Sequence, residues 1–262
     1  MGPRTDVIAF YGHATHKEGE LAILSNFFNQ RSWPGPFLFK VTLVFCACDI
    51  SQAERQVMCD FSEKTIMICK AAACGDIRTY RAIAQAEQPE EAKRLGSYAG
   101  PLQGFDQAMW DRIDCSVAFQ VAFQKNVNPE LSKILFGRKG FFAEMTHRDS
   151  IWGTGKHRED DTANDPSTWP GCNMLGWAFS ELRDLMGEAG PNSKAIESLR
   201  NAIADQEEKV ENGGTGPIAG ARETIAPPPA PLRGACSRGR QQDPAPPNND
   251  LTRQDLKSRK PG

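Results

Sequence analysis

The chain has 262 residues, and its 31 Lys and Arg against 33 Asp and Glu give a formal charge of −2. A near-neutral charge disfavours a protein coated for nucleic acid, although it leaves room for a local basic patch. No apolar run approaches the roughly 20 residues that span a bilayer, and the N-terminus lacks the apolar core of a secretory signal, so we expect no membrane contact and a cytoplasmic or nuclear protein.

The first 61 residues predict short elements. Residues 5–28 read as a short strand, a loop and a second short element that ends in LSNFF. The run FLFKVTLVFCAC, at 37–48, is the best strand candidate in the chain, because it is rich in β-branched and aromatic residues. Residues 50–57 fit either a short helix or a loop. The eight cysteines include no CxxC pair, which predicts reduced thiols and no metal site.

From residue 62 onward the chain predicts helices with clear boundaries. Gly75 is suited to end the first helix and Asp76 to cap the next, while Pro89 and Gly96 bracket a third. A long amphipathic helix spans 105–126, and Pro129 starts another. Further elements are predicted at 140–146 (a short strand), 174–186 (a helix) and 193–210 (a peripheral helix).

After Gly213 the composition changes to Pro, Gly, Arg and Gln with almost no aromatic residues, which predicts a disordered tail over 213–262. We therefore expect one compact domain over 5–187, a peripheral helical segment over 188–212, and the tail. The fold class is mainly α with a few short β-strands.

The stretch SEKTIMICKAAACGD, at 62–76, places two charges on an apolar helical stripe. Glu63 and Lys70 share one face with Ile66 and Met67 at spacings of three and four. One explanation needs no function: Asp60 and Glu63 fit a capping box, and Lys70 can extend its ammonium to water. The other is that this face forms the wall of a binding site, where each charge offsets the other and the ligand.

Three further stretches favour the second explanation. In RDSIWGTG, Asp149 stands near Trp152, which can stack on a flat ring, and Gly153 allows close backbone approach. In WPGCNMLG, Asn173 precedes a helix whose N-terminus can attract phosphate, although it can equally be an N-cap. Near the N-terminus, FYGH and LSNFF place His13 and Asn26 among aromatic residues.

The order of these segments carries more information than any one of them. FYGH and LSNFF, then SEKTIMICKAAACGD, then EEAKRLG with GFDQAMW, then RDSIWGTG, then WPGCNMLGWAFSELR, together resemble the NADAR family, also called YbiA-like, over roughly residues 8–187. The resemblance implies a compact, mainly helical fold. It implies an N-glycosidase that cleaves the bond between a ribose phosphate and a nitrogenous base.

Family members are linked to early riboflavin-pathway intermediates, to NAD and ADP-ribose metabolism, and to removal of ADP-ribose from guanine. The resemblance matches the family's glutamate, lysine, acid, tryptophan and asparagine to Glu63, Lys70, Asp149, Trp152 and Asn173. We expect Glu63, Asp149 and Lys70 to act in catalysis. We expect the substrate to be bound by His13, Asn26, Trp152, Gly153 and Asn173, with no cofactor and no metal.

The expected partner is a small ribose phosphate or an ADP-ribosylated base, either free or within a nucleic acid. Two alternatives stay open. One is a non-catalytic module that binds ADP-ribose or a nucleotide. The other is a structural protein in which all these residues are caps and core.

Overall fold

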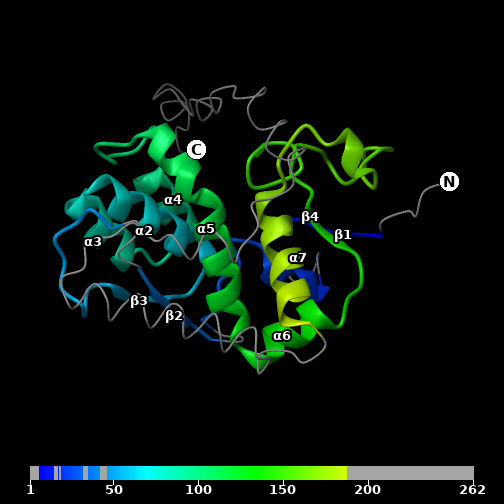
Figure 1. The fold of residues 1–262 in the computed structure, drawn as a ribbon, viewed down its shortest axis with the longest axis horizontal. Coiled ribbons are helices and arrows are strands. Elements are labelled where there is room, and N and C mark those ends of the chain that lie inside the picture. Colours follow the sequence, from blue (N-terminus) through cyan, green and yellow to red (C-terminus); the bar gives the residue numbers. More distant parts are fainter. Residues whose placement is uncertain (1–5, 15–16, 18, 32–34, 42–45, 188–262) are drawn as a thin grey trace, which may run out of the picture.

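The computed structural model describes residues 6–14, 17, 19–31, 35–41 and 46–187. Helices dominate this part of the chain and the strands are few and short, which confirms the predicted fold class (Figure 1). The elements in chain order are β1 (Val7–Phe10), η1 (Gly19–Leu24), β2 (Phe37–Lys40), β3 (Gln56–Cys59), α2 (Ser62–Cys74), α3 (Ile77–Gln85), α4 (Pro89–Gly96), α5 (Gln107–Asn126), α6 (Pro129–Phe136), β4 (Phe141–Glu144), η3 (Pro166–Thr168) and α7 (Met174–Met186).

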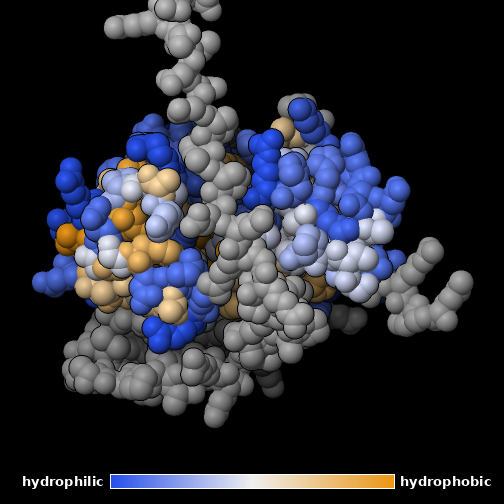
Figure 2. Space-filling model, turned by 90° about the horizontal axis from the view of Figure 1, so that it is seen from above, coloured by the Kyte–Doolittle hydropathy of each residue, from blue (hydrophilic) through white to orange (hydrophobic). Residues whose placement is uncertain are grey.

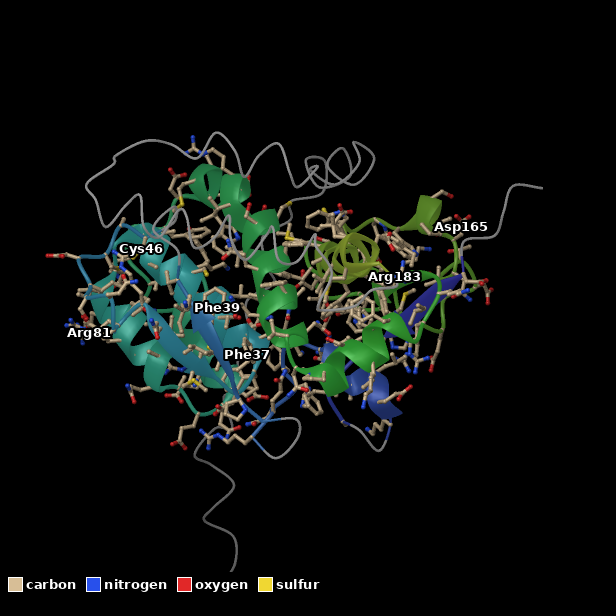
Figure 3. All side chains as sticks on the ribbon, turned by 60° about the horizontal axis from the view of Figure 1, so that its bottom comes forward. Phe37, Phe39, Cys46, Arg81, Asp165 and Arg183 are labelled. Atoms are coloured by element: carbon tan, nitrogen blue, oxygen red, sulfur yellow. The ribbon has the colours of Figure 1, made fainter. Side chains whose placement is uncertain are left out.

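One lobe packs α2, α3 and α4 with the antiparallel pair β2–β3. Phe37 pairs with Cys59 and Phe39 with Val57, and all four side chains are buried. The alternate positions on the strands point outward, as the two-residue period of a half-buried strand requires. Figure 3 shows Phe37 and Phe39 along β2, the strand that contacts α5.

The other lobe contains the parallel pair β1–β4, with α6 and α7. The long helix α5 runs between the two lobes (Figure 1). Its Val117 and Val121 belong to the core of the first lobe, whereas Phe119 and Phe123 belong to the core of the second. Trp152 packs against both cores. Two hydrophobic cores therefore meet along one helix, and Trp152 lies at their junction.

Several predicted boundaries are confirmed. Helices α2, α4 and α7 have the expected limits, Gly75 ends α2 with a left-handed φ of 73°, and the Asp76 carboxylate accepts from the Thr79 N–H. The predicted strand over 37–48 is confirmed for Phe37–Lys40, whereas Cys46 and Cys48 lie outside any strand. Positions 42–45, the predicted helix over 193–210 and the tail over 213–262 fall outside the described residues.

The sequence did not predict β3. The residues before it form a turn in which Glu54 accepts from the Ser51 N–H at 3.0 Å, and the chain then extends from Gln56. Those residues have no local preference strong enough to choose between helix and loop. The choice comes from β2, which supplies the hydrogen-bonding partner for β3.

Helix α7 approaches β4 very closely at Gly176. A Cβ at this position would lie 2.1 Å from the Phe142 carbonyl oxygen, which is backbone and cannot rotate away. We expect Gly176→Ala to lower the free energy of unfolding by about 1–3 kcal/mol, because the helix must shift to relieve the overlap. Urea unfolding measures the change.

Asp184→Ala, on an exposed position of the same helix, serves as the control and should change stability by less than about 0.5 kcal/mol. Equal stability of Gly176→Ala and the wild type would contradict the close packing of α7 on β4.

Candidate active site

Helix α2 buries Glu63 at its first turn. The helix begins at Ser62 after Phe61, and no side chain caps it, so the capping box considered for Asp60 and Glu63 does not form. Asp60 pairs instead with Arg31 at 2.5 Å. The Glu63 backbone N–H donates to the Asn26 carbonyl at 2.9 Å, and its side chain is only 5% exposed. The carboxylate of Glu63 is therefore buried without serving as a helix cap.

The segment Ser25–Phe27 lies against this helix start. Asn26 is buried, and its side-chain Oδ1 has no hydrogen-bond partner among the described residues. The Phe27 ring stacks on the His13 ring at 6.1 Å between centroids, and the Lys93 ammonium lies 5.4 Å from the Phe27 centroid. The structure thus brings the predicted binding residues His13 and Asn26 to the same end of α2 as Glu63.

Two lysines act on the Glu63 carboxylate. Burial raises the pKa of Glu63, the positive charges of Lys93 and Lys70 oppose that rise, and the negative charge of Asp149 adds to it. The Lys70 ammonium lies over the rings of Trp110 and Phe105, at 5.1 Å and 5.6 Å from their centroids. Lys70 therefore favours the ionised form of Glu63, as Lys93 on α4 also does, and its part in catalysis stays a prediction.

The loop after β4 carries the next two predicted residues. Asp149 Oδ1 accepts from the backbone N–H groups of Ile151 and Trp152, at 3.0 Å and 2.8 Å. These bonds close a turn that presents the partly buried Trp152 ring at the junction of the two cores. Gly153 follows, and a Cβ there would lie 2.2 Å from the Thr146 methyl group. Gly153 thus permits close packing within the protein, and its predicted contact with substrate stays a prediction.

Asn173 lies at the start of α7 with a left-handed φ of 49°, and it is fully buried. Its Nδ2 donates to the Phe142 carbonyl at 2.8 Å, and its Oδ1 accepts from the Glu144 N–H at 2.9 Å. The side chain therefore binds the backbone of β4. Its proposed contact with substrate stays a prediction, and its contact with the backbone of Glu144 gives it a positioning role.

The expectation that the N-terminus of α7 can attract phosphate is wrong for its first two N–H groups. Met174 and Leu175 donate their backbone N–H groups to the carbonyls of Ile151 and Trp152, both at 3.1 Å. A phosphate would have to displace these bonds. Just before this helix, the Gly171 N–H donates to the Thr154 carbonyl. The loop that contains Gly153 and the loop that contains Gly171 are therefore joined by backbone hydrogen bonds.

Two charged residues of the site were missed by the sequence reading. Glu144 ends β4 and Lys125 lies near the end of α5, fully buried. Burial and the negative charges of Asp149 and Glu63 raise the pKa of Glu144 to about 8, against the charges of Lys93 and Lys125. Burial lowers the pKa of Lys125 to about 7. A signal was available for Glu144, which stands inside the apolar run FFAEM, whereas Lys125 lies between Gln124 and Asn126 and gave none.

Three carboxyl groups, from α2, β4 and the loop that follows it, therefore lie within electrostatic range of one another, with lysines around them. Residues 10–186 match the model of the NADAR domain family. The chain belongs to the NADAR family. The match begins at Phe10, at the end of β1, and includes all of the predicted site residues.

Two curated relatives match this NADAR domain. Protein irg-1 of Caenorhabditis elegans is 26% identical over 138 residues, which are 52% of this chain and 65% of that protein. N-glycosidase R617 of Acanthamoeba polyphaga mimivirus is 27% identical over 126 residues, which are 47% of this chain and 72% of that protein. The match thus spans less than two thirds of the nematode protein. The NMR structure of the E. coli protein YbiA aligns with a TM-score of 0.48 at 20% identity, over 75% of this chain and 89% of that chain.

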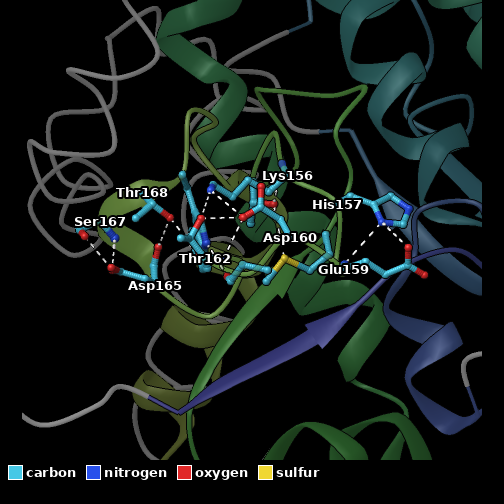
Figure 4. Close-up of polar contacts among 12 residues, drawn as sticks. Lys156, His157, Glu159, Asp160, Thr162, Asp165, Ser167 and Thr168 are labelled. Carbon is cyan, nitrogen blue, oxygen red and sulfur yellow. Dashed lines mark hydrogen bonds and ion pairs between the residues drawn. The ribbon is translucent and has the colours of Figure 1, made fainter.

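A polar loop of this NADAR domain, 156–168, follows the site segment and is stabilised by its own hydrogen bonds (Figure 4). Lys156 pairs with Asp160 at 3.2 Å and also contacts the Thr162 hydroxyl. Trp169 then donates its indole N–H to the Ala163 carbonyl at 2.7 Å and packs with Met145 beside β4. The loop therefore covers the outer side of the small sheet next to the site.

Within the described part of the chain, no group of three or more His, Cys, Asp or Glu side chains is arranged to hold a metal ion. Nor does that part contain a helix with the length and apolar character needed to cross a membrane. Six described cysteines carry free thiols: Cys46, Cys48, Cys59, Cys69, Cys74 and Cys115. Cys172 is disulfide-bonded, so the expectation of reduced thiols is wrong for that residue.

The raised pKa of Glu144 makes stability depend on pH. In the unfolded chain this carboxyl ionises near its ordinary value, whereas in the folded chain it holds its proton to about pH 8. The stabilisation of the folded state that comes from holding this proton is therefore complete at acidic pH, and it is lost as the pH rises towards 8. Between pH 5.5 and 7, we expect the wild type to lose up to about 1.4 kcal/mol more per pH unit than Glu144→Gln.

Urea unfolding at four pH values in that range measures the two slopes. Lys125, whose pKa is about 7, begins to lose its proton only towards the upper end of the range, and it is present in both proteins. Glu90→Gln, at an exposed position of α4, should follow the wild type. Parallel slopes for the wild type and Glu144→Gln would contradict a Glu144 carboxyl that stays protonated in this pH range.

Proposed function

We propose that this protein is an N-glycosidase that hydrolyses the bond between a ribose phosphate and a nitrogenous base. The observation that carries the proposal is that Glu63, Glu144 and Asp149 lie within electrostatic range of one another, and that Asp149 accepts from the Trp152 N–H. Hydrolysis of a glycosidic bond by this route needs carboxyl groups in different protonation states close to one sugar carbon. The viral relative is named an N-glycosidase, which supports the same reaction class.

The chemistry follows from the charge that develops on the sugar. As the base departs, positive charge builds on the ribose ring, and a nearby carboxylate stabilises it or activates the attacking water. We assign Glu63 and Asp149 to this task, which is to stabilise the positive sugar or to activate the water. Trp152 offers a flat apolar face against which the base can stack.

The lysines divide into two groups by their surroundings. Lys70 lies over Trp110 and Phe105, where it stabilises the ionised form of Glu63. Lys93 is an exposed residue of α4 whose ammonium lies over Phe27. We therefore assign the phosphate contact to Lys93, beside the Asn26 side chain whose buried oxygen has no partner in the described residues.

The substrate class is a small ribose phosphate that carries an amino-heterocyclic base, as in early riboflavin-pathway intermediates. Asn26 Oδ1 is a buried acceptor without a described partner, and such an acceptor favours a ligand that donates an O–H or N–H. A free ribose phosphate offers several such donors.

A second candidate is removal of ADP-ribose from guanine in a nucleic acid. The residues next to the site favour it: His147 and His157 lie 5.7 Å apart by centroid, Tyr11 lies 6.3 Å from His157, and Arg158 lies over Tyr11 at 5.9 Å. Aromatic rings interleaved with cations suit unpaired nucleotides. Glu159, Asp160 and Asp161 directly follow Arg158 in the chain, and their negative charges weaken the case. Seen from above, much of the molecule's surface is hydrophilic (Figure 2).

Glu63→Gln tests the reaction class. We expect it to keep the fold and to lower turnover by about 10²–10⁴-fold, because the amide cannot take a proton from water or stabilise the sugar cation. The assay uses two substrates, an aminopyrimidine ribose phosphate and an oligonucleotide with ADP-ribose on guanine. Glu90→Gln is the matched surface control.

Turnover of one substrate by the wild type, lost in Glu63→Gln, supports the enzyme and selects its substrate. Tight binding of ADP-ribose by both proteins without turnover of either substrate would favour the non-catalytic binding module. A melting temperature unchanged by any ribose phosphate would instead favour the structural role.

Lys93→Met tests the phosphate contact. We expect KM for the ribose phosphate to rise about tenfold or more with a smaller change in kcat, because an interaction with a non-reacting phosphate contributes mainly to binding. Arg94→Met, the adjacent exposed position of α4, is the control and should leave KM within about twofold. Equal KM values for Lys93→Met and Arg94→Met would assign the phosphate elsewhere.

A further inference from the structure

The backbone of Glu144 is held on several sides. Its N–H donates to Asn173 Oδ1 at 2.9 Å, and its carbonyl accepts from the Thr154 N–H at 2.9 Å. Phe10 of β1 lies opposite it in parallel register. A side chain that extends from such a fixed backbone is suited to proton transfer, which requires the acid within hydrogen-bond reach of the acceptor.

The charged groups that face Glu144 come from four segments. Glu63 of α2 and Asp149 of the loop oppose its ionised form, whereas Lys93 of α4 and Lys125 of α5 favour it. Glu63 faces as many lysines but one carboxylate fewer, because Lys93, Lys70 and Asp149 act on it. A proton in this cluster is therefore favoured on Glu144, the carboxyl that faces two others.

Lys125 connects Glu144 to the segment beside Glu63. Its side chain is 1% exposed, and its Nζ donates to the Ser25 carbonyl at 3.1 Å. The next residue, Asn26, accepts from the Glu63 N–H. Burial lowers the pKa of Lys125, and the negative charge of Glu144 raises it. A buried ammonium in this place fixes the Ser25 backbone and stabilises an ionised Glu144 at the same time.

We propose that Glu144 is the general acid that protonates the leaving base, and that Lys125 is the positioning residue that orients it and stabilises its ionised product. The proposal rests on the N-glycosidase function given above. It assigns the proton donor, which the reaction needs beside the water-activating carboxylate.

The step balances as follows. When the bond between C1′ and the base nitrogen breaks, its electron pair goes to the base, and the Glu144 proton goes to the base with it. Water adds to C1′ and gives its proton to the carboxylate of Glu63 or Asp149. That proton returns to Glu144 between turnovers, so the net change is hydrolysis by one water molecule.

The decisive experiment compares two leaving groups. One substrate is the aminopyrimidine ribose phosphate, whose base needs a proton to leave, and the other is 4-nitrophenyl ribose 5-phosphate, whose phenolate leaves without one. We expect Glu144→Gln to lose about 100-fold or more on the first and less than about threefold on the second, and Glu63→Gln to lose activity on both. Equal losses by Glu144→Gln on both substrates would overturn the assignment.

A second readout needs no substrate. Infrared difference spectra of the full chain at pH 6.5, wild type minus Glu144→Gln, should show the C=O stretch of one protonated carboxyl group. Its absence would overturn the proposal even if the protein hydrolyses both substrates. Its presence in a protein that hydrolyses neither would overturn the proposed function, and the catalytic role of Glu144 with it.

Lys125→Arg should move the basic limb of the pH profile of kcat/KM to lower pH, because a permanent charge stabilises ionised Glu144 over the whole limb. Wild-type Lys125, with a pKa of about 7, has largely lost its charge where Glu144 ionises, so Lys125→Met should move the limb much less. Lys139→Met, at an exposed site, should leave it unchanged. A fixed limb in Lys125→Arg would show that Lys125 is only structural.

Discussion

The bridge from the Asn173 carboxamide to β4 is the interaction on which the site depends. Strand β4 has β1 along one edge, and on another side Asn173 accepts from the Glu144 N–H and donates to the Phe142 carbonyl. One side chain thus supplies hydrogen bonds that a further strand would otherwise supply. The start of α7, the end of β4 and the Asp149 loop are joined as a result, and they carry two of the three carboxyl groups.

Close backbone approach makes this arrangement possible. A Cβ at Gly171 would lie 2.5 Å from the Gly153 carbonyl oxygen, and a Cβ at Gly176 would overlap the Phe142 carbonyl. The glycines that suggested a ligand loop in the sequence therefore serve, in the folded chain, to let two segments of the protein interlock. The effect on function is indirect, because the interlock determines where Asp149, Trp152 and Glu144 stand.

Electrostatics at the site follow from where the cores meet. Helix α5 contributes to both cores, and near its end Lys125 is buried in range of Glu144, while α2 buries Glu63 from the other lobe. Burial raises the pKa of both glutamates and lowers the pKa of Lys125, while the neighbouring charges separate the two carboxyls, because Glu144 faces one carboxylate more than Glu63 does. Such a division is what acid–base chemistry near neutral pH requires.

The sequence by itself determined the helices and the first three charged candidates. Helices α2, α4 and α7 depend on local signals, such as the apolar period, Pro89 and Gly75, and Glu63 stood out as a charge on an apolar stripe. Only the tertiary structure decided β3, which pairs with the distant strand β2, and the surroundings of Asn173, Lys93, Glu144 and Lys125. The physical reason is that burial, pairing and electrostatic shifts arise between segments distant in sequence, which a local pattern cannot bring together.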